Sequence, residues 1–101
     1  EATGRVSEAF GLFFAERAVP MRLQTASEDF SDIPTALGTP YSYWGVGCID
    51  ADGYRAAEQA GRVAQDIPVN HAAQFAPVIQ PTLDTGTQAL VVAALAWLGT
   101  G

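Results

Sequence analysis

The chain has 101 residues, of which 49% are hydrophobic and only 16% are charged, and its formal net charge is −6. Its five basic residues are all arginines, so it offers no basic patch for phosphates and we expect no nucleic-acid partner. A chain of this length forms at most one domain with a modest core. The low charge content predicts that part of its apolar surface packs against something else.

No apolar run approaches the roughly 18–20 residues that a membrane span requires, and no basic segment precedes an apolar start. We therefore expect a soluble, cytoplasmic protein with no membrane partner. The single cysteine, Cys48, cannot form an internal disulfide. Its neighbours Gly47 and Ile49 indicate that it is buried in a strand and is not a reactive thiol.

The first part of the chain predicts a helix followed by a short strand. Apolar residues recur at helical spacing from Val6 to Ala18, which predicts an amphipathic helix over 3–17 that ends before Pro20. Residues 21–25 alternate apolar and polar side chains, as in a strand.

A second, shorter helix is predicted over 28–37, ending at Gly38. The Ser27 hydroxyl is placed to cap its first amides, and Glu28 and Asp29 lie where the helix dipole favours acids. Capping is the default explanation for these two acids. The functional alternative is an acidic group beside a cleft.

The remaining elements predict an α/β fold. Aromatic and β-branched residues over 41–49 predict an inner strand of a sheet. Residues 50–66 are expected to hold a loop and about two turns of helix, and three prolines favour an ordered loop over 67–81. A helix over 82–98 is apolar almost all round, which predicts that it is buried.

His71, the only histidine, lies in this proline-rich loop. A neutral imidazole can bind a metal, transfer a proton or form a hydrogen bond, so a lone histidine is not specific. The sequence contains no Gly-x-Ser-x-Gly, no paired histidine and no Cys-x-x-Cys. A hydrolase triad is not indicated, because His71 has no evident nucleophile as a partner.

Several motifs together point to a family. They are Ser27-Glu28-Asp29-Phe30, an aromatic segment ending in glycine, Asn70-His71 followed by Phe75-Ala76-Pro77, and Pro81-Thr82-Leu83 before an Ala/Leu-rich helix. In this order they resemble the C-terminal end of the metal-dependent amidohydrolases that include hippurate hydrolase, aminoacylase, indole-acetyl-amino-acid hydrolase and aminobenzoyl-glutamate hydrolase. The resemblance covers about residues 6–99, which is a minor C-terminal part of the family's length.

The resemblance implies a mixed-sheet catalytic domain flanked by helices and interrupted by a smaller lid domain. It also implies two divalent ions, zinc or manganese, that are bridged by a carboxylate. The family's last metal ligand is a histidine in the loop before the final helix, and His71 matches it. The family commonly has Ser-Pro after this histidine, whereas Ala72-Ala73 follows it here.

We therefore expect residues 1–101 to be the C-terminal part of a metallohydrolase catalytic domain, consistent with a start at Glu1 without methionine, inside an expected helix. The resemblance implies cleavage of N-acyl amino acids or small peptide-like amides by a homo-oligomeric enzyme. A catalytic zinc needs about three protein ligands. The other ligands and the general base would lie upstream, so this segment would hold no catalytic residue, bind no metal alone and be inactive. The alternative is a non-catalytic α/β interaction module in which His71 is structural.

Overall fold

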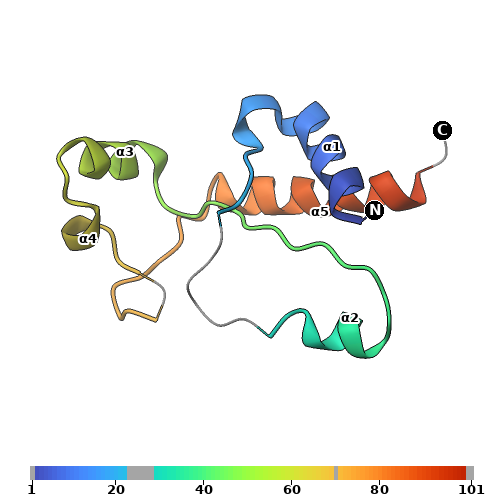
Figure 1. Ribbon diagram of the computed structural model, residues 1–101. Helices are drawn as coiled ribbons and strands as arrows, with labels where there is room; N and C mark the ends of the chain where they lie inside the picture. Colours follow the sequence, from blue (N-terminus) through green and yellow to red (C-terminus); the bar gives the residue numbers. More distant parts are fainter. Residues whose placement is uncertain (1, 23–28, 70, 100–101) are drawn as a thin grey trace. The chain divides into compact units, whose positions relative to one another are not determined.

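The computed structural model describes residues 2–22, 29–69 and 71–99. Within these ranges the regular structure is helical (Figure 1). Contacts divide the chain into two compact units, one formed by Glu1–Gly45 with Thr87–Gly101 and the other by Val46–Gly86. The helices are α1 (Ala2–Phe14), its 3-10 continuation η1 (Ala15–Arg17), α2 (Asp32–Ala36), α3 (Ala51–Gln59), α4 (Val63–Asp66) and α5 (Thr82–Leu98).

The predicted α/β fold with a mixed sheet is wrong, because no residue that the structure describes belongs to a strand. Residues 41–48 are irregular, although their exposure alternates as in a strand, with the odd-numbered residues exposed and the even-numbered ones half-buried. A strand also needs a hydrogen-bonded ladder. Here the amide of Val78 donates to the carbonyl of Cys48 at 2.9 Å, and no ladder extends from this bond among the described residues.

The strand predicted over 21–25 is not found where it can be checked. Met21 and Arg22 have no regular structure, and residues 23–25 lie outside the described part of the chain. Alternation of apolar and polar residues along so short a segment indicates only that the backbone prefers an extended conformation. A strand also requires a neighbouring strand to pair with.

The first predicted helix is confirmed, since α1 and η1 together cover residues 2–17. The chain leaves η1 at Ala18, which is extended with φ −90° and ψ 107°, two residues before Pro20. The second helix is shorter than predicted, because α2 begins at Asp32. Ser27 and Glu28, which were expected to open it, lie outside the described residues.

Glycine ends two of the helices in the same manner. At the end of α3, Gly61 has φ 68°, its amide donates to the carbonyl of Glu58 at 3.1 Å, and the amide of Arg62 donates to that of Ala57 at 2.8 Å. This is a Schellman motif, and its left-handed residue favours glycine. Helix α2 ends likewise at Gly38, with φ 63°, which confirms the predicted stop.

The first unit has a small core made of residues from α1 and α5. Its buried residues are Val6 and Phe14 on α1 and Ala89 and Ala93 on α5. The ring of Phe10 packs edge-to-face on that of Phe14, with centroids 5.7 Å apart. Such a pair stabilises the fold by about 0.5–1.5 kcal/mol beyond the contribution of the area that it buries.

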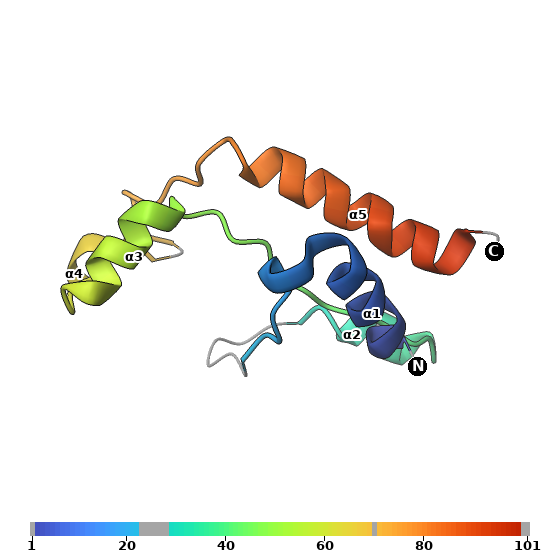
Figure 2. The same ribbon diagram turned by 90° about the horizontal axis from the view of Figure 1, so that it is seen from above.

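Helix α5 has the predicted bounds (Figure 2), but its side chains do not have the predicted burial. Its buried residues are two alanines, whereas Leu83, Leu90 and Leu98 are 59%, 65% and 80% exposed. The three leucines follow at intervals of seven and eight residues, so they share one helix face. We call Leu83, Leu90 and Leu98 the leucine face of α5. None of the described helices is long and apolar enough to cross a membrane.

Candidate functional site

The loop between α4 and α5 holds His71, as the sequence predicts, and its described residues are free of regular structure. The amide of Ala72 donates to the carbonyl of Val69 at 3.1 Å, which closes a turn that contains His71. A second turn follows at once, since the amide of Phe75 donates to the carbonyl of Ala72 at 3.0 Å. Backbone hydrogen bonds therefore define the path of the chain around His71.

His71 is exposed and has φ 69°, in the left-handed region. This conformation costs a non-glycine residue roughly 1–2 kcal/mol, and such residues concentrate at functional sites. The feature is not specific alone, because Ala15 in η1 also has a positive φ, of 52°. No other described residue forms a hydrogen bond with the imidazole.

A metal ion needs several ligands, and the part of the chain described here supplies no complete set. No group of three or more His, Cys, Asp and Glu side chains is close enough to hold an ion among these residues. Two acids in the unit of His71 have other partners: Asp66 is 3.0 Å from Arg62 and Asp84 is 3.2 Å from Gln80. A catalytic zinc requires about three protein ligands.

Glu28 and Asp29 are the two acids predicted beside the capping Ser27. Glu28 lies outside the described residues. Asp29 is exposed and belongs to the other compact unit, and its carbonyl accepts a hydrogen bond from the amide of Asp32 at 3.0 Å. This contact is typical of a turn that leads into a helix.

Sequence reasoning missed a pair of contacts where the His71 loop enters α5. The side-chain carbonyl of Gln80 accepts from the amide of Asp84, and its amide group donates to the Asp84 carboxylate, both at 3.2 Å. The Gln80 side chain thus satisfies one free backbone amide in the first turn of α5, as the N-cap side chain of a capping box does. Its signal in the sequence is a Gln four residues before an Asp at the beginning of an apolar run.

A shallow cavity lies beside the His71 loop within the same unit. Its volume is about 350 Å³, and Val69 and Ala72, which flank the turn, contribute to it. His71 itself does not line it. The lining contains two amide side chains and no charged group; it consists of Ala64, Gln65, Ile67, Pro68, Val69, Ala72 and Gln74.

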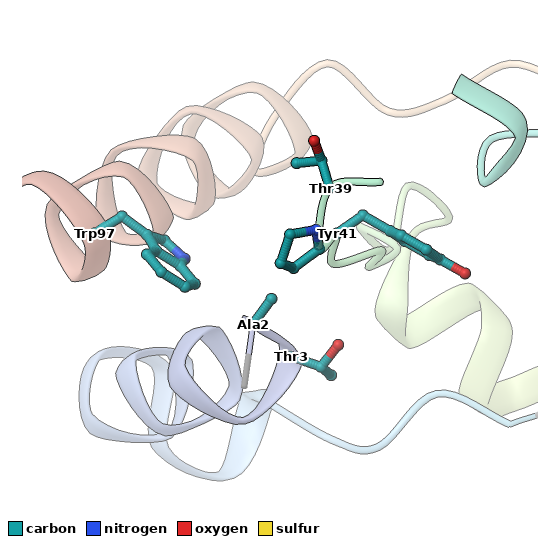
Figure 3. A pocket seen from close by; sticks show the side chains of 6 residues that line it. Ala2, Thr3, Thr39, Tyr41 and Trp97 are labelled. Carbon is teal, nitrogen blue, oxygen red and sulfur yellow. The ribbon is translucent and has the colours of Figure 1, made fainter. Parts of the chain in front are cut away.

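A second shallow cavity, of about 340 Å³, lies in the other unit. Figure 3 shows Trp97 of α5 on one side and Ala2 of α1 with the loop residues Thr39 and Tyr41 around the remaining sides. The guanidinium of Arg5 stacks over the Trp97 ring at 4.6 Å from its centroid. The lining side chains include no carboxylate, imidazole or thiol, so this cavity lacks the groups that usually bind metal ions.

Comparison with known proteins adds no family assignment. No family model matches the chain, and no solved structure matches it. The resemblance to the amidohydrolases therefore stays a prediction from the sequence motifs.

Proposed function

We propose that the chain is part of a metal-dependent amidohydrolase and that His71 is one of its metal ligands. The observation that carries this proposal is the state of His71: its imidazole is exposed and unpaired among the described residues, on a turn in the loop before the last helix. The resemblance requires the family's C-terminal histidine ligand in such a loop. A neutral imidazole is the commonest metal ligand in proteins.

The substrates of the proposed enzyme are N-acyl amino acids or small peptide-like amides. In the family, two zinc or manganese ions polarise the amide carbonyl and activate water. The remaining ligands and the general base belong to other parts of a longer polypeptide in this proposal. Because the described residues include no complete ligand set, the 101-residue chain alone is expected to be inactive and to bind no metal.

In this proposal the chain contributes the imidazole and the backbone turn that carries it. The turn from Val69 to Ala72 fixes the backbone around His71, and the contacts between Gln80 and Asp84 fix the far end of the loop on α5. A ligand held by such supporting contacts loses less entropy when it binds an ion.

Exposed apolar side chains on several elements support the proposal that the chain belongs to a larger protein. Leu12 on α1, Ile33 on α2 and Leu37 directly after α2 are more than two-thirds exposed. Extended apolar surface of this kind marks contact sites with other protein surfaces. We expect the complete protein to cover these residues and to form a homo-oligomer.

The test is amide hydrolysis by the protein that contains this segment, assayed on a panel of N-acyl amino acids. The His71→Ala variant is expected to lose at least about 100-fold in kcat/KM, since loss of supporting contacts alone costs 10–100-fold. Gln74→Ala is the matched control, because Gln74 is exposed in the same loop. A folded His71→Ala variant with normal activity would contradict the proposal, as would a metal-loaded parent that cleaves no amide.

The exposure of the leucine face of α5 favours a second candidate function, a non-catalytic module that packs this helix against a protein partner. His71 is then a surface residue without a ligand. In that case the parent protein binds no metal, His71→Ala changes nothing, and Leu90→Glu abolishes complex formation. Metal content therefore separates the two candidates in one measurement.

A further inference from the structure

We draw no further inference here: the strongest candidate, the leucine face of α5, is an unpartnered apolar surface, and nothing in the structure shows what covers it.

Discussion

Helices α3 and α5 differ in what determines them. Free backbone groups at both ends of α3 form hydrogen bonds with residues next to the helix in the sequence. The carboxylate of Asp50 accepts the amide of Gly53 at 2.8 Å, and Gly61 closes the other end with its left-handed conformation. In contrast, α5 has 17 residues and strong apolar character, but its large side chains on the leucine face have no cover.

The comparison separates two kinds of information in the sequence. Caps and glycine stops act over four or five residues, so a short segment contains all that is needed to set a helix end. Burial of a helix face depends on other elements, which the pattern of that helix does not specify. We expect substitutions on α3 to have local effects and substitutions on α5 to depend on which face they change.

The largest effect is expected for Ala93→Glu. Ala93 is 8% exposed, so the substitution places a carboxylate in the small core of the first unit. We expect it to lower the free energy of unfolding by about 3 kcal/mol or more, measured by denaturation followed by circular dichroism. Ala94→Glu is the control, since Ala94 is exposed and should cost less than about 0.5 kcal/mol. Equal losses for the two variants would show that Ala93 is not buried.

A smaller effect is expected for Leu90→Glu, which introduces a charge into the leucine face. We expect the isolated chain to self-associate through its exposed apolar residues and the variant to raise the dissociation constant at least about tenfold, or 1.4 kcal/mol. Sedimentation velocity over a range of concentrations measures this change. Gln59→Glu on α3 is the control, because it adds the same charge at an exposed polar residue outside the leucine face. A wild-type chain that stays monomeric throughout would refute the expectation.

Asp50→Ala tests the local side of the comparison. Loss of its hydrogen bond to the Gly53 amide should destabilise α3 by about 1 kcal/mol. Hydrogen exchange of the α3 amides reports this loss, while exchange in α5 should not change. Asp50→Asn retains a capping oxygen and should restore most of the protection. Protection that is unchanged in Asp50→Ala would show that the cap does not hold this end.

The smallest effect is expected for Arg62→Ala. Arg62 makes two contacts with the Asp66 carboxylate, at 3.1 and 3.0 Å, but both side chains are more than 40% exposed. Exposed ion pairs of this kind contribute about 0.2–1 kcal/mol and weaken with salt. We expect a loss at the low end of this range that disappears in 1 M salt, measured by the same denaturation method. A loss above 1 kcal/mol would mean that Arg62 does more than pair with Asp66.

These contrasts explain which parts of the fold were predictable. The bounds of α5 and the stop of α2 at Gly38 follow from periodicity and glycine chemistry, and both are confirmed. The prediction of a sheet was wrong because the residue pattern over 41–49 specifies an extended chain and does not supply a second strand for it to pair with. The prediction that α5 is buried was wrong for the same reason. The apolar pattern of a helix does not specify whether another element covers its leucine face.

The candidate site was predictable in position but not in conformation. Prolines and the lack of periodicity predict that His71 lies in a loop, and the structure agrees. The positive φ of His71 and the contacts of Gln80 with Asp84 depend on the geometry of the turn and the helix start. Periodicity and local spacing cannot predict a metal site whose ligands are distant from one another in the sequence.

The most direct test of the proposed role of His71 is the metal stoichiometry of the protein that contains this segment. We predict two zinc or manganese ions per chain in the parent, and the loss of at least one in His71→Ala, measured by elemental analysis on folded protein. Gln74→Ala should retain both ions. A parent that binds no metal, or a folded His71→Ala variant that still binds two ions, would contradict the assignment of His71 as a ligand.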